Sequence, residues 1–127
     1  YPATIFPQVA KHLNWTPEGR FPSEIFNSQA LYSELRAIAP TYQGNGLGNV
    51  LRSKQILDAV EKGYSQIIIY TVDDAVITNN SFGFKELDTI RAVFGDGSTS
   101  RLHLMKLDIT KHSLEKAIST LDKYRRR

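Results

Sequence analysis

A predicted strand, a glycine-rich loop and a predicted helix follow one another in the first half of the chain. The strand covers residues 30–39 and ends at Pro40, which cannot donate a hydrogen bond to a sheet ladder. Apolar residues at helical spacing predict a helix over residues 47–62, and Gly63 is suited to its C-terminal cap. The loop Gln43–Gly48 therefore leads from a strand into the first turn of a helix. This order favours folds in which helices pack against a sheet.

The loop has the composition of an anion-binding turn. Backbone N–H groups in the first turn of a helix have no internal partners, and the helix dipole adds partial positive charge there. Glycines at positions 44, 46 and 48 let the backbone approach an anion closely. No Walker-type lysine follows, and the spacing misses the third glycine of the dinucleotide fingerprint. The loop thus favours a bound phosphate group, with a purely structural turn as the alternative.

Three further strands are predicted over residues 66–72, 84–94 and 100–109. The first is apolar on both faces, which is typical of a central strand. Turn-forming residues at 95–99 predict a hairpin between the other two. Together with the helices, these strands predict an α/β fold with a mixed sheet.

Two more helices complete the prediction. Asp73 is suited to the N-cap of a short helix that runs towards Asn80. A final helix is expected over residues 112–124. Its inner face should carry Leu114, Ala117, Ile118 and Leu121.

Composition excludes several classes of function. The chain of 127 residues is 41% hydrophobic and 23% charged, as in an ordinary globular domain, and no apolar run is long enough to span a bilayer. The absence of cysteine excludes disulfides, thiolate metal sites and a cysteine nucleophile, and the spacing of the histidines indicates no metal site. His103 alternates with Met105 and Leu107, which favours a buried, hydrogen-bonded histidine over a catalytic one. We therefore expect a cytoplasmic protein without a metal or a membrane contact.

Basic residues at the C-terminus supply part of the net charge of +3. Lys123 and residues 125–127 are interpreted as a solvated helix end, where cations interact favourably with the helix dipole. A tail that binds RNA is the alternative, although the charge is too mild to make nucleic acid the expected partner.

Two linked motifs identify a family resemblance. Residues Gln43–Gly48 fit the pattern Arg or Gln, two residues, Gly, one residue, then Gly or Ala. Downstream, Gly83, Phe84 and Lys85 follow a predicted strand and short helix. Both motifs resemble the GNAT superfamily of acyl-CoA-dependent N-acyltransferases, in which a Gly-Phe pair opens the sixth strand. The resemblance covers about residues 30–109 and implies a twisted, mostly antiparallel mixed sheet flanked by helices.

The resemblance also implies acetyl-CoA as the co-substrate. Backbone N–H groups of the loop and helix start would bind the coenzyme A pyrophosphate, at Gly44, Asn45, Gly46, Leu47, Gly48 and Asn49, and Gln43 would help to shape the loop. The backbone of the preceding strand would pair with the pantetheine arm, at Ala37, Ile38 and Ala39. Residues 68–72 would form the other wall of the cofactor slot.

The reaction that the resemblance implies is transfer of an acetyl or other acyl group to a primary amine by direct attack. Glu34 is the candidate general base, being the only acid on the strand before the loop, and the alternative is an exposed glutamate paired with Arg36. Asn79 occupies the position at which the family carries a tyrosine that acts as the general acid. Asparagine can hydrogen-bond a thiolate but cannot protonate it. The proton donor would then be solvent or another residue, for which the candidates are Tyr32, Tyr42, Tyr70 and Ser81.

An asparagine at this position leaves a second function open, a non-catalytic acyl-CoA-binding or regulatory module. The expected organisation is a divergent or truncated segment over residues 1–29, an acyl-CoA-binding core over 30–109 and a C-terminal helix with a basic tail over 110–127. Family domains place several elements before the fourth strand, so another chain could complete the sheet, and an open sheet edge favours a homodimer. The amine acceptor, a small molecule or a peptide, is not specified by the sequence.

Overall fold

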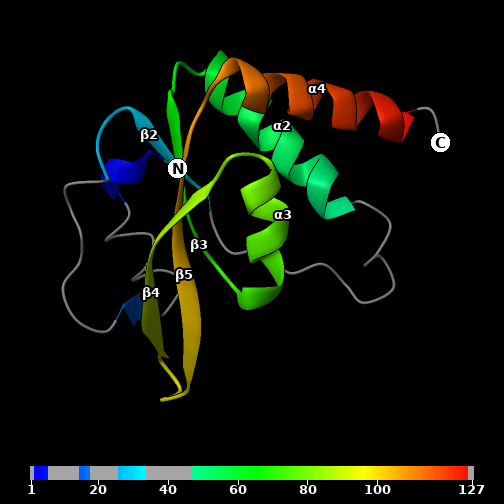
Figure 1. Cartoon of the computed structure of the whole chain (residues 1–127). Coiled ribbons are helices and arrows are strands. Elements are labelled where there is room, and N and C mark those ends of the chain that lie inside the picture. Colours follow the sequence, from blue (N-terminus) through cyan, green and yellow to red (C-terminus); the bar gives the residue numbers. More distant parts are fainter. Residues whose placement is uncertain (1, 6–14, 18–25, 34–46, 126–127) are drawn as a thin grey trace.

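The computed structural model describes residues 2–5, 15–17, 26–33 and 47–125 (Figure 1). Within these ranges, five strands form one mixed sheet in the order β1-β4-β5-β3-β2. The elements are η1 (Ala3–Ile5), β1 (Trp15–Pro17), β2 (Ala30–Ser33), α2 (Leu47–Glu61), β3 (Gln66–Thr71), η4 (Asp73–Ala75), α3 (Val76–Ser81), β4 (Lys85–Phe94), β5 (Thr99–Asp108) and α4 (Lys111–Arg125). The prediction of an α/β fold with a mixed sheet is confirmed.

The sheet contains one parallel pair of strands. β2 runs parallel to β3, with Ala30 opposite Gln66 and Ser33 opposite Ile69, and α2 lies between them in the chain. The other pairs are antiparallel, and β5 lies between β3 and β4. Parallel strands have their carboxyl ends at the same edge of the sheet, so β2 and β3 end side by side.

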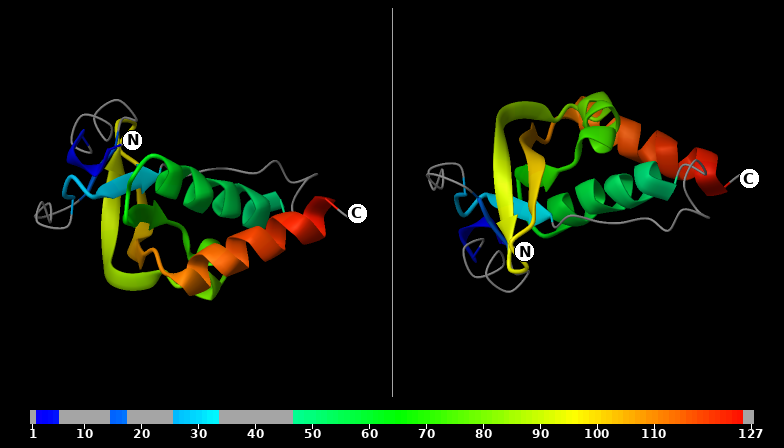
Figure 2. Two further views of the ribbon diagram at one scale, coloured as in Figure 1. Left: turned by 90° about the horizontal axis from the view of Figure 1, so that it is seen from above. Right: turned by 90° about the horizontal axis from the view of Figure 1, so that it is seen from below.

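The three α-helices cover one face of the sheet (Figure 2). The core on this face joins residues of α2, α4, the end of α3 and the strands, namely Ile56, Ala59, Ile67, Ile69, Phe82, Phe84, Met105, Leu107 and Ala117. Residues 67–71 of β3 are all buried, because this strand has neighbours on both sides and apolar side chains on both faces. The prediction that it is central in the sheet is confirmed.

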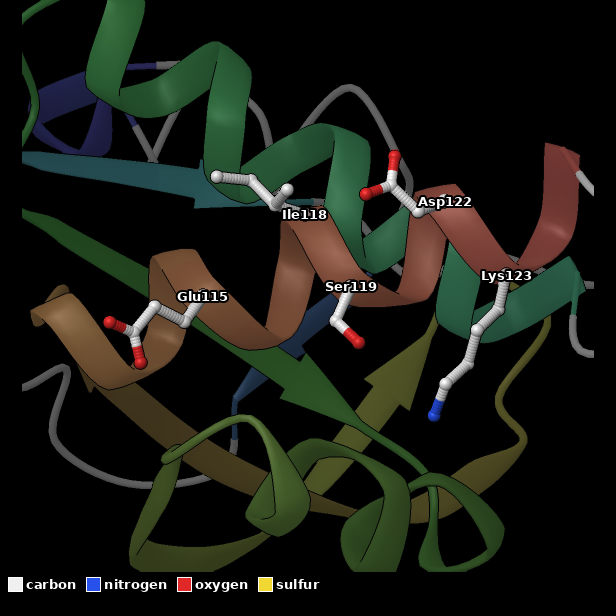
Figure 3. Close-up of a pocket in the computed structure, with 5 residues that line it drawn as sticks. All are labelled: Glu115, Ile118, Ser119, Asp122 and Lys123. Carbon is white, nitrogen blue, oxygen red and sulfur yellow. The ribbon is translucent and has the colours of Figure 1, made fainter.

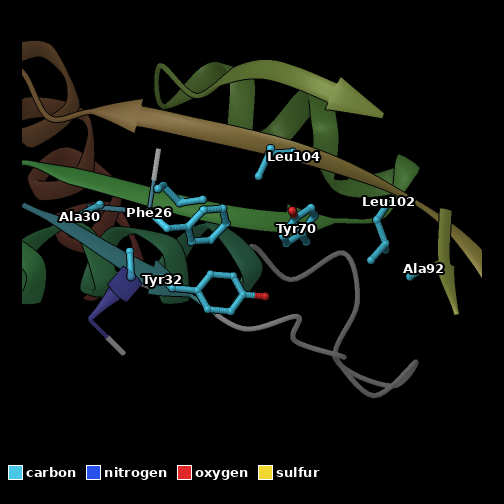
Figure 4. Close-up of a cluster of buried hydrophobic side chains, with 9 residues drawn as sticks. Phe26, Ala30, Tyr32, Tyr70, Ala92, Leu102 and Leu104 are labelled. Carbon is cyan, nitrogen blue, oxygen red and sulfur yellow. The ribbon is translucent and has the colours of Figure 1, made fainter. Parts of the chain in front are cut away.

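An aromatic cluster fills the opposite face of the sheet (Figure 4). The Phe26 and Tyr70 rings stack with centroids 6.3 Å apart, and Tyr32 meets Tyr70 edge to face at 6.4 Å. Leu102 and Leu104 of β5 pack against this cluster. Burial raises the pKa of Tyr70, which makes its hydroxyl a weak proton donor.

Glycines end two of the helices in the same way. Gly63 follows α2 with φ +86°, its N–H donates to the Val60 carbonyl, and the Tyr64 N–H donates to the Ala59 carbonyl. This pair of hydrogen bonds is a Schellman motif, and the predicted C-terminal cap is confirmed. Gly83 ends α3 with φ +104°, which a residue with a Cβ adopts only under strain.

The strand and helix limits agree with the sequence predictions within a residue or two over residues 47–125. Residues 30–33 are strand, and the rest of the predicted 30–39 strand lies outside the described residues. Two details were wrong. Asp73 is the first residue of η4 and not an N-cap, because its carboxylate bonds to His103 instead of local N–H groups. Ile118 is half exposed, because α4 turns Ala117 and Leu121 towards the core.

Candidate functional site at the carboxyl ends of β2 and β3

The predicted site residues divide between described and undescribed parts of the chain. Leu47, Gly48 and Asn49 form the first turn of α2, and Asn79 lies in α3. Gly48 is half-buried and Asn49 is exposed. The remaining predicted residues lie outside the described residues, namely Glu34, Ala37, Ile38, Ala39, Gln43, Gly44, Asn45 and Gly46.

Four polar side chains meet beside the end of β2. We call Ser33, Arg52, Gln55 and Asn79 the polar network. Arg52 donates through Nε to Asn79 Oδ1 at 3.0 Å and through Nη1 to Ser33 Oγ at 3.4 Å. Arg52 Nη1 also bonds to Gln55 Oε1, and Gln55 Nε2 donates to Ser33 Oγ at 2.7 Å. The network therefore links β2, α2 and α3 at the carboxyl end of the parallel pair, where open α/β sheets bind ligands.

The helical repeat explains why Arg52 reaches this position. Arg52 and Gln55 are three residues apart, so both lie on one face of α2, while Ile56 and Ala59 face the core. The Arg52 guanidinium lies over the Phe84 ring, with Cζ 5.2 Å from the centroid. This cation–π contact restrains the Arg52 side chain. The Gly83–Phe84 pair thus has a physical role in the structure, since Gly83 ends α3 and Phe84 supports Arg52.

Asn79 carries a buried hydrogen-bond donor. The side chain is 2% exposed, and its Oδ1 faces Arg52 Nε. Arginine can only donate, so the amide oxygen must lie on this side and Nδ2 must point the other way. Among the described residues, Nδ2 has no hydrogen-bond partner. A buried donor without a partner costs about 1–3 kcal/mol, which a ligand with an acceptor atom would recover.

A second polar cluster surrounds His103 on the helix-covered face of the sheet. The ring is 5% exposed, with Nδ1 2.5 Å from Glu86 Oε1 and Nε2 bonded to Asp73 Oδ1. Thr89 donates to Glu86 at 2.8 Å, and Arg101 Nε lies 3.8 Å from Asp73 Oδ1. His103 is thus buried and hydrogen-bonded, as the sequence predicts.

Mutual hydrogen bonding shifts all three ionisable groups of this cluster. The hydrogen bond to Glu86, followed by that to Asp73, raises the pKa of His103 against the effect of burial. The hydrogen bond from His103 in turn lowers the pKa of the Asp73 and Glu86 carboxyls. A ring with both nitrogens donating has no lone pair to accept a proton. In this state His103 joins two carboxylates and does not act as a base.

The alternative proton donors that the structure describes lie elsewhere. Tyr32 and Tyr70 belong to the aromatic cluster on the opposite face of the sheet from the polar network. Ser81 is exposed at the end of α3 and donates to the Thr78 carbonyl at 2.6 Å. Tyr42 lies outside the described residues.

A shallow depression on α4 is separate from both polar clusters (Figure 3). It is lined by Glu115, Ile118, Ser119, Asp122 and Lys123, all from this one helix. Among the described residues, no second element lines it, so this part of the chain offers a surface and not an enclosed site. In the parts of the chain that the structure describes, no three or more acidic or histidine side chains form a group that could hold a metal ion. The described helices are also too short or too polar to cross a membrane.

Comparison with models of known protein families gives no match, and comparison with curated protein sequences gives none either. Of the polar network, Asn79 is among the residues predicted from the sequence, and Arg52, Ser33 and Gln55 are not. The spacing of Arg52 and Gln55 places them on one helix face, but it does not tell which strand that face meets.

Proposed function

We propose that the chain is an acyl-CoA-dependent N-acyltransferase of the GNAT type. It transfers an acetyl or other acyl group from coenzyme A to a primary amine. The observation that carries the proposal is the motif Gln43–Gly48, whose last two residues begin α2 beyond the end of β2. The N–H groups of a helix start bind phosphate oxygens, and coenzyme A carries a pyrophosphate.

The arrangement of the sheet supports the same proposal. A GNAT-type slot for pantetheine lies between two neighbouring strands that splay apart, and β2 and β3 are neighbouring parallel strands. Residues 37–39 would continue from β2 along the pantetheine arm. The reacting end of the co-substrate would then lie near Ser33 and Asn79, where a buried amide donor has no partner among the described residues.

In this reaction the amine nitrogen attacks the thioester carbonyl carbon, a C–N bond forms and the C–S bond breaks. Glu34, next to Ser33 in the chain, takes the proton of the amine directly or through one water. The Asn79 amide hydrogen-bonds the leaving sulfur. Since an amide cannot protonate a thiolate, the thiolate takes its proton from solvent.

Calorimetric titration with acetyl-CoA tests the proposal. The wild-type chain should bind saturably, and Gly46→Glu should weaken binding by about tenfold or more, because a carboxylate in the loop repels the pyrophosphate. Gly95→Glu is the matched control, since it adds the same charge at the exposed turn between β4 and β5 and should leave binding unchanged. Absence of binding at millimolar acetyl-CoA would remove the cofactor assignment.

A non-catalytic acyl-CoA-binding module is the second candidate. It is favoured by one observation, the amide of Asn79 in place of an ionisable acid. The two functions differ in thiol release from acetyl-CoA across a panel of small-molecule and peptide amines. Release that saturates with one amine supports the transferase, while binding without release for any amine supports the module.

A further inference from the structure

The polar network fixes the direction of the buried Asn79 donor. Arg52 Nε lies 3.0 Å from Asn79 Oδ1, so the amide cannot rotate by half a turn without bringing two donors together. Asn79 Nδ2 is thereby held pointing away from Arg52, at a place where no described residue accepts from it.

Arg52 itself is held from several sides. Its Nη1 contacts Ser33 of β2 and Gln55 of α2, and its Cζ lies 5.2 Å from the centroid of the Phe84 ring, just before β4. A guanidinium has a fixed fork of donors, which an ammonium group lacks. The orientation of Asn79 is therefore set through one side chain that is held by β2, α2 and Phe84.

The network also brings positive charge to the site. The guanidinium sits on the oxygen side of the Asn79 amide and polarises it, which strengthens the donor on the opposite side. A polarised donor in a buried position favours an electron-rich acceptor, and an anionic acceptor more than a neutral one. The thiol end of coenzyme A becomes such an anion when the thioester is cleaved.

We propose that Arg52 is a positioning residue for the reacting end of the co-substrate: it orients the Asn79 amide so that Nδ2 donates a hydrogen bond to the coenzyme A sulfur. This inference rests on the proposed function. It assigns Asn79 as the group that contacts the sulfur and Arg52 as the group that acts through it. It accounts for the buried donor, the Arg52–Phe84 contact and the position of Ser33 together.

Comparing the affinities for coenzyme A and for desulfo-coenzyme A, which lacks the sulfur, separates the Asn79–sulfur contact from the rest of cofactor binding. The wild-type chain should bind coenzyme A more tightly than desulfo-coenzyme A, and the preference should grow as pH rises and the bound thiol ionises. The ultraviolet absorbance of the thiolate reports that ionisation directly. A role limited to folding would change the affinity for both ligands equally.

Three variants test the residues. Asn79→Asp keeps an oxygen for Arg52 and the same shape, but replaces the donor by a second acceptor. Arg52→Met removes the guanidinium at similar length, and Lys54→Met is the matched control, because it removes a positive charge from an exposed position of the same helix. We expect the preference for coenzyme A to fall by about tenfold or to vanish in the first two variants and to persist in the control.

The outcomes are distinct. An unchanged preference in Asn79→Asp overturns the inference, as does a wild-type chain that binds both ligands equally. If Arg52→Met does not fold, Asn79→Asp, compared with the Lys54→Met control, still decides the role of the Asn79 donor. Arg52→Lys then decides the role of the guanidinium, because it keeps the positive charge but removes the fork of donors. A wild-type chain that binds neither ligand overturns the proposed function and this inference with it.

Discussion

Replacing His103 by glutamine should change how the stability of the fold depends on pH. The ring is 5% exposed and both of its nitrogens face carboxylates, those of Glu86 and Asp73. These contacts raise the pKa of His103 in the folded chain. In the unfolded chain the carboxylates are remote, and the pKa returns to about 6.5.

The sign of the effect follows from the raised pKa. Between pH about 6.5 and the folded pKa, the folded chain binds more protons than the unfolded chain, so stability falls as pH rises. The contribution of His103 is fully present below pH about 6.5 and is lost as pH rises through the folded pKa. One titrating group changes the free energy of unfolding by at most about 1.4 kcal/mol per pH unit. The partner side chains of Asp73 and Glu86 are 67% and 39% exposed, so solvent screening keeps the slope below this ceiling.

The carboxylates limit the useful range on the acid side. The pKa values of the Asp73 and Glu86 carboxyls are lowered in the folded chain. Their contribution to the free energy of unfolding is therefore fully present above the ordinary carboxyl pKa of about 4, and it is lost as pH falls through the lowered pKa values of the folded chain. A range from about pH 5.5 to about pH 9 therefore isolates the histidine.

Urea denaturation followed by circular dichroism measures the effect. The difference in unfolding free energy between wild type and His103→Gln should be largest at the acid end of this range and should shrink as pH rises. His112→Gln, which removes an exposed histidine from α4, is the matched control. A difference that stays constant across the range, or grows with pH, would refute the assignment of a charged ring between two carboxylates.

Other substitutions test the fold. Gly83→Ala should destabilise the chain by about 1–3 kcal/mol, because φ is +104° and the new Cβ would lie 3.2 Å from Leu107 Cδ1. Gly63 has φ +86° and open space where a Cβ would lie, so Gly63→Ala should lower thermal stability less than Gly83→Ala does. A larger loss for Gly63→Ala would contradict the role of the contact between the new Cβ at position 83 and Leu107. Ile68→Ala removes a fully buried side chain of β3 and should cost about 2–5 kcal/mol in urea denaturation. Ile77→Ala, at a side chain 82% exposed, should stay within about 0.5 kcal/mol, and equal effects at both positions would argue against the burial described.

The elements over residues 47–125 could be predicted because their signals are local. The apolar run at 67–69 in β3 and the turn residues at 95–99 each specify their own segment. Gly63 marks the end of α2 through its own backbone angle. Such patterns do not depend on which segments meet in space, so sequence reasoning can find them.

The polar contacts could not be predicted for the opposite reason. Arg52 and Asn79 are 27 residues apart, and Asp73 and His103 are 30 apart, so only the packed sheet brings them together. The wrong prediction of an N-cap at Asp73 has the same cause, because His103, which is distant in the sequence, takes the Asp73 carboxylate from the local N–H groups. Among the predicted site residues, the structure describes the surroundings of Asn79. The roles of the glycine loop and of Glu34 stay predictions.

His103 has a consequence for motion as well as for charge. Its two partners lie at the two ends of one chain segment, because Asp73 begins η4 and Glu86 follows α3 in β4. One ring of β5 therefore closes the segment 73–86 like a non-covalent cross-link. Closing a loop at its ends removes much of the freedom of the residues inside it. The segment should therefore open as one cooperative unit in hydrogen exchange, with the amides of α3 losing protection together when the ring is released. Asn79 lies within this unit, so the occupancy of the cross-link also sets how long the network around Arg52 stays assembled.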